Sequence, residues 1–354
     1  MPRLLRYLAP AVAGAIPTLA VPAVSPAQTA LPEIVVQAPS PIITSTQTVA
    51  VETEPQADTP SLLNGMMIAE DVISPVTVIT GEQATQGTSR TIGDAVFSKP
   101  GVTSSTFAPG ASRPIIRGLD NFRVRVQENG IGVHDVSDLS EDHAVPVDPL
   151  NQGKIEIIRG PATLRWGSQA IGGVVSVTNS RIPDYIPPGG FLRATATGGY
   201  TSVDDGSEGA FMAEGGDGVL AFHVDGFRRE GDDYDIPGAP GKQANSFYEA
   251  DGHAVGGSLV FDRGYFGLSV SRYSSLYGIP GEEAAEREVR IDLEQTKLTG
   301  KGEWRPAGGA IEAVRTWFGI SDYEHDEIAR HDPGDPLEVG STFVNKQREG
   351  RTEV

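Results

Sequence analysis

Residues 265–273 read "YFGLSVSRY", and the alternation of apolar with small or polar residues in this stretch decides the fold class. Successive side chains of an extended strand point to opposite faces, so Phe266, Leu268 and Val270 share one face. Small and polar side chains, Ser269 among them, lie on the other face together with Tyr265. The stretch therefore predicts a strand with one apolar and one polar face, as in a wall between lipid and water or in a soluble β-sandwich.

The same alternation recurs in the rest of the chain. About eight such segments follow residue 190, separated by turns rich in Gly, Asp and Pro. Residues 218–227, "GVLAFHVDGF", and residues 314–327, "VRTWFGISDYEHDE", show it again. Aromatic residues, which are favoured at membrane interfaces, end several segments, at Tyr200, Tyr273 and Trp304. We therefore expect residues 190–354 to form a transmembrane antiparallel β-barrel rather than a sandwich.

The composition excludes several classes of protein. The 43 Gly and 26 Pro residues favour many turns over long helices, so a helical bundle is not expected. A net charge of −19, distributed along the chain, disfavours a nucleic-acid partner and favours cations. Cysteine is absent, which excludes disulfides and thiolate metal sites. The sequence has no HExxH, GxSxG or GxxxxGK[ST] motif, so we expect neither enzyme activity nor a tightly bound cofactor.

The N-terminal part of the chain predicts export and a flexible tail. Arg3 and Arg6 precede an apolar run that ends in small residues, so residues 1–27 are predicted to be a cleaved signal peptide. Residues 28–67 are rich in Pro, Thr, Ser and Gln and predict a linker. The linker holds one β-prone island, made of Glu33, Ile34, Val35 and Val36. Such an island can pair with the sheet edge of a partner or be an accident of composition, and its residues alone leave both open.

Residues 68–184 predict a small α+β domain. A strand is expected in "SPVTVIT", and the spacing of Ile92, Ala95 and Val96 predicts a short helix that ends before Pro100. "RPIIRG" and "FRVRVQENGIGV" are predicted to form a strand pair, with a hairpin turn at Asn129–Gly130. "KIEIIRGPATLRWGSQAIGGVVSV" predicts a strand, a turn region bounded by Gly, and a second strand.

An acidic loop, "DVSDLSEDHAV" at residues 135–145, follows the predicted hairpin and has few strand-forming residues. Carboxylates with one imidazole suit a borderline divalent metal such as Zn²⁺, Mn²⁺ or Cu²⁺. One loop binds weakly, so further ligands are expected from the barrel, where His325 shares the polar face of its strand with Tyr323 and Glu327. A polar extracellular loop without a metal explains His325 equally well. The predicted metal ligands are Asp138, Glu141, Asp142, His143 and His325. The competing interpretation is a solvated acidic loop without a ligand, and His134 is expected to be structural.

The segment from Ser112 to Pro183 resembles the plug domain of TonB-dependent outer-membrane receptors. "PVTVIT" and "TIGDAVFSKPGV" resemble the first part of that domain, "IEIIRGPATLRWGSQAIGGVVSV" resembles its last part, and "PEIVVQA" resembles the TonB box. The resemblance implies a barrel of about 22 strands, filled by the plug, in the outer membrane of a Gram-negative bacterium. Its expected activity is uptake of a scarce ligand with energy that the partner TonB passes on from the inner membrane.

Within this family, the segment 123–149 and the motifs "DDYDIPG", "YGIPG" and "DYEHDEI" resemble the zinc-uptake branch. That resemblance implies a metal-binding role for Asp142 and His143. The branch commonly carries a histidine-rich loop after "YGxPG", whereas "GEEAAEREVR" offers only glutamates here: Glu282, Glu283, Glu286 and Glu288. Because glutamate selects less for zinc than imidazole does, the expected ligand is a divalent, zinc-like metal ion or its complex.

Three alternatives stay open. A ferric siderophore would be bound by aromatic and Arg side chains in the barrel lumen. A receptor that signals through its tail is disfavoured because the linker 28–65 is too short and polar for a further domain, and an exported hydrolase lacks a catalytic constellation. Eight strands enclose an interior only wide enough for side chains, so we expect the chain to be part of a longer barrel protein.

Overall fold

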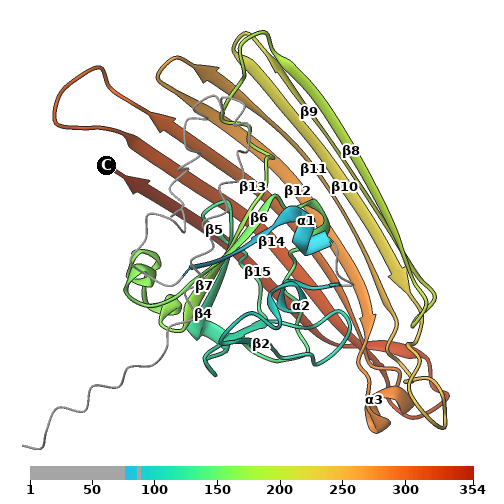
Figure 1. Ribbon diagram of the computed structural model, residues 1–354. Coiled ribbons are helices and arrows are strands. Elements are labelled where there is room, and N and C mark those ends of the chain that lie inside the picture. Colours follow the sequence, from blue (N-terminus) through green and yellow to red (C-terminus); the bar gives the residue numbers. More distant parts are fainter. Residues whose placement is uncertain (1–75, 86–88) are drawn as a thin grey trace, which may run out of the picture. The chain divides into compact units, whose positions relative to one another are not determined.

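The structure is a computed structural model that describes residues 76–85 and 89–354, which belong to one compact unit. It has two parts, the plug up to residue 184 and an eight-stranded antiparallel sheet, here called the wall (Figure 1). The predicted signal peptide, the tail and the residues predicted to bind TonB lie outside the described residues. Within the described part, no helix has both the length and the apolar character needed to cross a membrane.

The plug is built around a mixed five-stranded sheet with the order β1-β6-β7-β4-β5. Its strands are β1 (Val76–Thr80), β4 (Val124–Glu128), β5 (Ile131–Gly132), β6 (Lys154–Ile158) and β7 (Gly173–Thr178). The predicted hairpin at Asn129–Gly130 joins β4 to β5, and the β4–β7 pair is parallel. Short helices complete the domain, α1 (Gly81–Thr85), α2 (Ile92–Val96) and 3₁₀ turns at Asn121–Arg123, Pro149–Asn151, Pro161–Trp166 and Ser168–Ala170.

Helix α2 forms where its spacing predicts it. Thr91 accepts a hydrogen bond from the Asp94 amide (3.2 Å), and Asp94 accepts one from the Thr91 amide (3.3 Å), which closes a capping box at the N-terminus. Ile92 and Val96 are fully buried against the strand residues of the plug core. One expected strand pair was wrong: β3 (Pro114–Ile116) pairs with β2 (Val102–Ser104), because a 3₁₀ turn separates it from β4.

The wall is a meander in which each strand pairs with the next. Its strands are β8 (Phe191–Thr201), β9 (Gly206–Asp217), β10 (Leu220–Gly231), β11 (Tyr248–Phe261), β12 (Gly264–Gly278), β13 (Arg290–Trp304), β14 (Val314–Arg330) and β15 (Leu337–Glu353). Helix α3 (Glu282–Glu286) lies in the connection between β12 and β13. The end of the wall that carries this connection and the loops 232–247 and 331–336 is called the α3 end (Figure 1).

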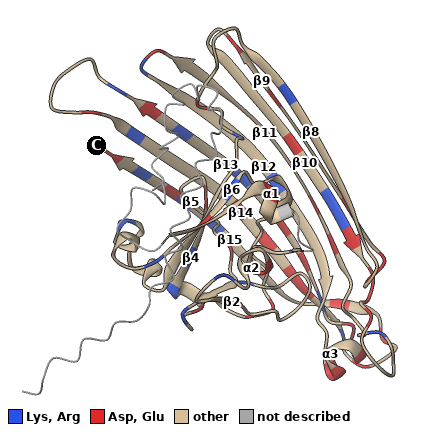
Figure 2. Cartoon of the chain, in the orientation of Figure 1, with Lys and Arg blue, Asp and Glu red and all other residues tan. Residues whose placement is uncertain are grey.

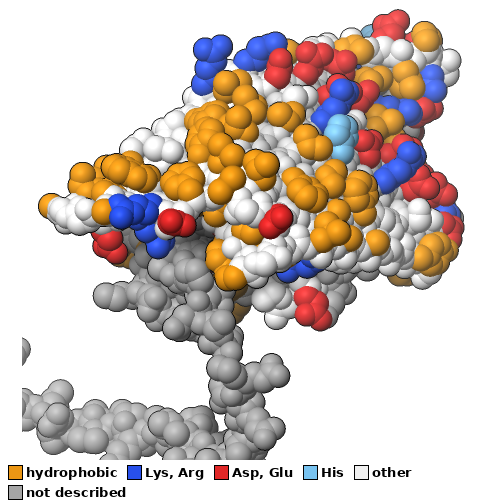
Figure 3. Space-filling model, turned by 90° about the horizontal axis from the view of Figure 1, so that it is seen from above, with side chains coloured by type: hydrophobic (Ala, Val, Ile, Leu, Met, Phe, Trp, Pro, Cys, Tyr) orange, Lys and Arg blue, Asp and Glu red, His pale blue; other side chains and the backbone are white. Residues whose placement is uncertain are grey.

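The two faces of the wall differ as the alternation predicts. In β12, Phe266, Leu268 and Val270 are exposed on the face away from the plug, while Tyr265 and Ser269 are buried toward it. The outward residues of neighbouring strands extend this surface, and Figure 3 shows hydrophobic side chains gathered over it; they include Leu192, Phe211, Leu220, Phe222, Val255, Leu259 and Ile320. This band of exposed apolar side chains on one sheet face matches the lipid-facing band of a barrel.

The charged and aromatic positions refine this view. Acidic residues are found toward the α3 end of the wall (Figure 2), where Asp292 is the register partner of Asp326 across β13 and β14. Tyr200 and Trp304 are exposed, in agreement with membrane-interface positions. Tyr273 was wrongly predicted at this interface, because it lies on the inner face, where its ring packs against Phe227 with centroids 6.0 Å apart.

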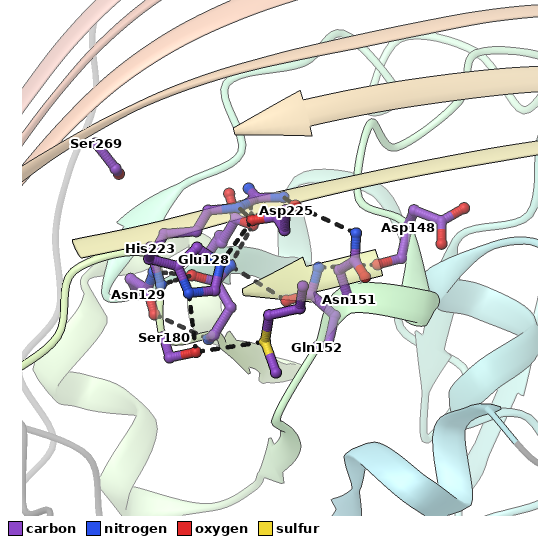
Figure 4. Close-up of polar contacts among 12 residues, drawn as sticks. Glu128, Asn129, Asp148, Asn151, Gln152, Ser180, His223, Asp225 and Ser269 are labelled. Carbon is purple, nitrogen blue, oxygen red and sulfur yellow. Dashed lines mark hydrogen bonds and ion pairs between the residues drawn. The ribbon is translucent and has the colours of Figure 1, made fainter. Parts of the chain in front are cut away.

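Buried ion pairs join the plug to the wall through Arg181. Figure 4 shows Glu128 and Asn151 of the plug beside His223 and Asp225 of β10. Its guanidinium contacts Glu128 of the plug at 3.0 Å and Asp225 of β10 at 2.8 Å. Asp225 also accepts a hydrogen bond from Asn151 (3.2 Å) and lies 2.9 Å from Nε2 of His223. We call this set the anchor network; its members are Glu128, Asn151, Arg181, Glu214, His223 and Asp225.

Candidate metal centre

One buried guanidinium, that of Arg113, fixes the acidic loop 135–145 through hydrogen bonds to its backbone. Arg113 donates hydrogen bonds to the carbonyl oxygens of Ser137 and Ser140, the latter at 2.8 Å. It also donates twice to the carboxylate of Asp120, at 2.7 and 2.8 Å. Burial acts to raise the pKa of Asp120, but the hydrogen bonds from Arg113 and from the Asn121 amide outweigh it and lower that pKa. The ion pair of Arg113 with Asp120 therefore fixes the loop 135–145 against the rest of the plug.

His143 lies at the end of this loop with its ring buried. Nδ1 is 3.0 Å from the carbonyl oxygen of Val136. A carbonyl only accepts, so Nδ1 carries a proton and the neutral ring has its lone pair on Nε2. That nitrogen faces two carboxylates, Glu327 of β14 at 3.3 Å and Asp142 at 3.8 Å. Because acceptors face one another here, the arrangement requires a cation between them, either a proton or a metal ion.

His325 of β14 stands next to His143, with ring centroids 4.4 Å apart. Its Nδ1 bonds the hydroxyl of Tyr323 at 2.8 Å, whereas its Nε2 is buried and has no hydrogen-bond partner. Phe343 of β15 stacks on the His325 ring at 4.8 Å and also contacts His143 at 4.9 Å. The aromatic packing fixes both imidazoles and shields them from water, while one buried nitrogen stays unsatisfied. A buried polar atom without a partner costs about 1–3 kcal/mol unless something binds it.

One ligand atom each from His143, His325 and Glu327 lies within 4.8 Å of the others. In the described residues, this is the one group of at least three His, Asp or Glu side chains with such spacing. Zinc binds nitrogen and oxygen at about 2.0–2.2 Å, which places tetrahedral ligands about 3.3 Å apart. The 3.3 Å separation between His143 Nε2 and Glu327 meets that value, and Asp142 offers a fourth oxygen nearby. The residues present therefore fit a divalent metal with a small closure of the site.

The structure brings together only some of the predicted ligands. His143, His325 and Asp142 meet, but Asp138 is exposed outside the group and Glu141 lies beside Arg113 at 3.8 Å. Glu288 is paired with Arg290 and Arg330, both at less than 3.0 Å, and is not available to a cation at α3. His134 bonds Ser321 (3.0 Å) and Glu349 (2.9 Å), which makes it structural as expected.

Sequence reasoning missed Glu327 as a candidate ligand. The alternation along β14 already put Glu327 on the same face as His325, two residues away, so the signal was present in the spacing. The spacing did not reveal that the loop 135–145 would contact β14 at Glu327. The contact between His143 and Glu327 joins residues 184 positions apart in the chain.

The comparisons with known proteins agree with this geometry. Residues 69–174 match the model of the TonB-dependent Receptor Plug Domain. This domain is similar to the plug of TonB-dependent receptors. With the apolar outer face of the wall, it gives the chain the fold of these receptors, which are outer-membrane proteins of Gram-negative bacteria.

The relatives are transporters and receptors, in agreement with the prediction that the chain is not an enzyme. It is 27% identical over 218 residues to the vitamin B12 transporter BtuB of Photobacterium profundum, which is 60% of this chain and 35% of that protein. It is 30% identical over 152 residues to a hemin receptor of Yersinia pestis, 42% of this chain and 22% of that protein. The chain thus spans about a third or less of each curated relative.

Among solved structures, the copper transporter OprC superposes with a TM-score of 0.58 at 15% identity. The match covers 72% of this chain and 38% of that one. At this identity the likeness concerns the fold, a plug against a β-wall. The relatives do not single out the zinc-uptake branch.

Proposed function

We propose that the chain takes part in TonB-dependent uptake across the outer membrane, and that its ligand is a divalent metal ion held between plug and wall. The observation that carries the proposal is that Nε2 of His143, the carboxylate of Glu327 and the unbonded Nε2 of His325 lie close together. A proton between His143 and Glu327 would satisfy one pair only. A metal ion would satisfy all three groups at once.

The origin of the ligands suggests how the ion is released. Asp142 and His143 belong to the plug, whereas His325 and Glu327 belong to β14 of the wall. Any displacement of the plug along the wall separates these two halves, and each half alone is a weak site. Energy applied to the plug would therefore lower the affinity for the ion, which links transport to plug movement through a coupling free energy.

The partner in this proposal is TonB, a strand of which would pair with Glu33, Ile34, Val35 and Val36 in the tail. Main-chain hydrogen bonds of such an added strand transmit force without demanding a particular side-chain sequence. The tail precedes β1, the first strand of the plug sheet, which pairs with β6 over five residues. Pulling at the tail would therefore act first on β1 and then on the plug core.

The nature of the ion follows from the donor atoms. Two imidazoles with one or two carboxylates suit borderline ions such as Zn²⁺ or Cu²⁺ better than Mg²⁺ or Ca²⁺, which prefer all-oxygen sites. We therefore propose a zinc-like ion, as the resemblance to the zinc-uptake branch implies. The glutamates Glu282, Glu283 and Glu286 of α3 would gather cations at the entrance rather than choose among them.

A ferric siderophore is the second candidate, and one feature favours it. A cavity of about 340 Å³ at the α3 end is lined by Arg90, Phe107 and Tyr234, the types of side chain that grip a bulky anionic aromatic ligand. This cavity shares no lining residue with the metal cluster.

Metal-binding calorimetry on the full chain in detergent micelles tests the proposal. Zn²⁺ should bind the wild type, and the double variant Asp142→Ala, His143→Ala should lose the heat. Equal heats for both proteins, or no heat for either, would remove the metal and leave the siderophore. The variant Phe107→Ala is the matched control, because it alters the second cavity at an exposed side chain and leaves the metal ligands intact.

A further inference from the structure

The motif "YGIPG" at residues 277–281 has no part in the ligand set, yet its tyrosine contacts the plug at the metal ligands. We infer that Tyr277 is a positioning residue, which fixes the backbone on both sides of His143 and so aims its imidazole at the wall. This inference rests on the proposed metal site and names what sets its geometry. Tyr277 is the penultimate residue of β12, near the α3 end, and is fully buried.

The hydroxyl of Tyr277 makes two backbone contacts that flank the ligand. It donates to the carbonyl oxygen of Asp142 at 2.7 Å and accepts from the amide of Ala144 at 3.0 Å. His143 lies between these two groups. With Nδ1 held by the Val136 carbonyl, both the backbone and the ring of His143 are fixed, and Nε2 has one direction left to it.

A second plug segment lies against the same ring. A Cβ placed on Gly110 would be 2.3 Å from Cγ of Tyr277, closer than any real contact, so only glycine allows this approach. Ala108 and Ala111 close the turn around Gly110 through backbone hydrogen bonds of 3.0 and 3.1 Å. The ring of Tyr277 therefore contacts two plug loops, and the hydroxyl bonds the one that carries His143.

The rest of the motif holds Tyr277 in place from the wall side. A Cβ on Gly278 would lie 2.4 Å from the carbonyl oxygen of Asn245, so glycine permits the loop 232–247 to pack here. Asn245 donates to the carbonyl oxygens of Ile279 (2.9 Å) and Val289 (2.6 Å), which closes the base of the α3 loop. Asp233 in turn accepts hydrogen bonds from the backbone amides of Asn245 (3.2 Å) and Ser246 (2.6 Å). Asn245 thus links the motif "DDYDIPG" to the motif "YGIPG", and these hydrogen bonds fix the backbone next to Tyr277.

Removal of the hydroxyl would leave a buried carbonyl and a buried amide without partners, and the loop would shift to find water. Outer partners of metal ligands typically contribute 10- to 100-fold to affinity, so we expect Tyr277→Phe to weaken Zn²⁺ binding by about that factor. Gly110→Ala, which adds one methyl group on the plug side of the ring, should weaken binding in the same range. As both changes disturb one contact, their combination should cost less than the sum.

The experiment measures Zn²⁺ affinity by competition with a chelating dye, and the visible spectrum of bound Co²⁺, on the full chain in detergent micelles. Tyr248→Phe is the matched control, because its buried hydroxyl contacts Tyr273 (3.4 Å) and not the plug loop. We expect weaker binding and an altered Co²⁺ spectrum for Tyr277→Phe and for Gly110→Ala, and wild-type behaviour for Tyr248→Phe. Wild-type affinity and spectrum in either test variant, or equal losses in the control, would overturn the inference.

Hydrogen exchange over residues 135–145 separates this inference from the proposed function. If the wild type binds neither ion, the metal site is wrong, and the exchange of this segment then decides the role of Tyr277 alone. Faster exchange in Tyr277→Phe than in Tyr248→Phe supports positioning. Identical exchange in the two variants contradicts it.

Discussion

Two buried histidines of the wall, His223 in β10 and His325 in β14, face the plug in contrasting surroundings. His223 has a carboxylate at each ring nitrogen, Glu214 at 3.4 Å and Asp225 at 2.9 Å. His325 bonds Tyr323 through Nδ1 and leaves Nε2 without a partner. Both side chains are about equally buried, so burial alone does not distinguish them. The difference lies in whether the hydrogen-bonding capacity of the ring is used up.

Both ring nitrogens of His223 have partners, whereas one ring nitrogen of His325 has none in the described part of the chain. Around His223, Arg181 pairs with Glu128 and Asp225, and Arg193 pairs with Glu214, so each carboxylate of the anchor network has a cationic partner. Around His325, the nearest groups are an imidazole, an aromatic ring and the carboxylate of Glu327, and no Lys or Arg is paired with that carboxylate in the described residues. A cation from outside would complete this second site.

The largest expected effect concerns the anchor network. Asp225→Ala removes the partner of Arg181, His223 and Asn151 together, and the loss of one member of a buried ion pair costs about 3–5 kcal/mol. Urea unfolding of the full chain in lipid vesicles should show this loss. The exposed pair Arg228–Glu230, 3.3 Å apart on the same strand, is the control, and Glu230→Ala should cost no more than about 1 kcal/mol. Equal losses of unfolding free energy in Asp225→Ala and Glu230→Ala would contradict the special role of the anchor network.

The next effect separates the two histidines by function. His325→Ala should weaken Zn²⁺ binding by about 100-fold or more, since loss of a ligand exceeds loss of an outer partner. His223→Ala should leave Zn²⁺ affinity nearly unchanged, because no ligand atom of the cluster belongs to the anchor network. Calorimetry with both variants checks this, and a similar loss of affinity in each would show that the distinction is mistaken.

A pH titration tests how burial acts on the plug side of the interface. Burial raises the pKa of Asp148 to about 6, and the negative charge of Glu208 adds to the rise, although the guanidinium of Arg229, 3.0 Å away on β10, acts against it. A raised carboxyl pKa adds stability that is complete below about pH 4 and is lost as the pH rises through 6. Wild type should therefore lose roughly 2–3 kcal/mol across this window relative to Asp148→Asn. If the unfolding free energies of the wild type and Asp148→Asn changed equally between pH 4 and 6, the raised pKa of Asp148 would be refuted.

The smallest effect concerns the acidic residues that lie outside the cluster. Asp138→Ala and Glu141→Ala should change Zn²⁺ affinity less than about two-fold. Both side chains are exposed outside the cluster, and solvent and salt screen their charges from the bound ion. The competition assay used for Tyr277 measures them directly. A ten-fold loss in either variant would show that the loop binds as a whole and that the cluster is drawn too narrowly.

Much of the fold follows from local pattern, and the faces of the wall are the clearest case. Alternation in β12 and β14 placed Ser269, Tyr323 and His325 on the inner face without any structure. Tyr273 was misplaced because an aromatic residue near a strand end suits both a membrane interface and a packed core, and only the parity along β12 decides between them. The pairing of β3 with β2 depended on a 3₁₀ turn that the sequence does not signal strongly.

The candidate site was predicted in part for the same reason. His143 and Asp142 came from the composition of one loop and the resemblance, and His325 from strand parity. The roles of Glu327 and Tyr277 depend on which residues of the wall strands the plug loop contacts. Long-range contacts set that docking position, for example the contact of Tyr277 with Ala144, 133 positions away in the chain. Residues whose roles arise only from such docking cannot be ranked from local sequence.

The central claim is that one imidazole from the plug and one from the wall bind the same ion. X-ray absorption at the zinc edge of the metal-loaded full chain measures this most directly, because it counts imidazole and oxygen ligands around zinc. We predict two imidazoles with oxygen ligands at about 2.0–2.1 Å, and one imidazole after either His143→Ala or His325→Ala. A shell of oxygen alone, or a shell that neither substitution changes, would contradict the claim.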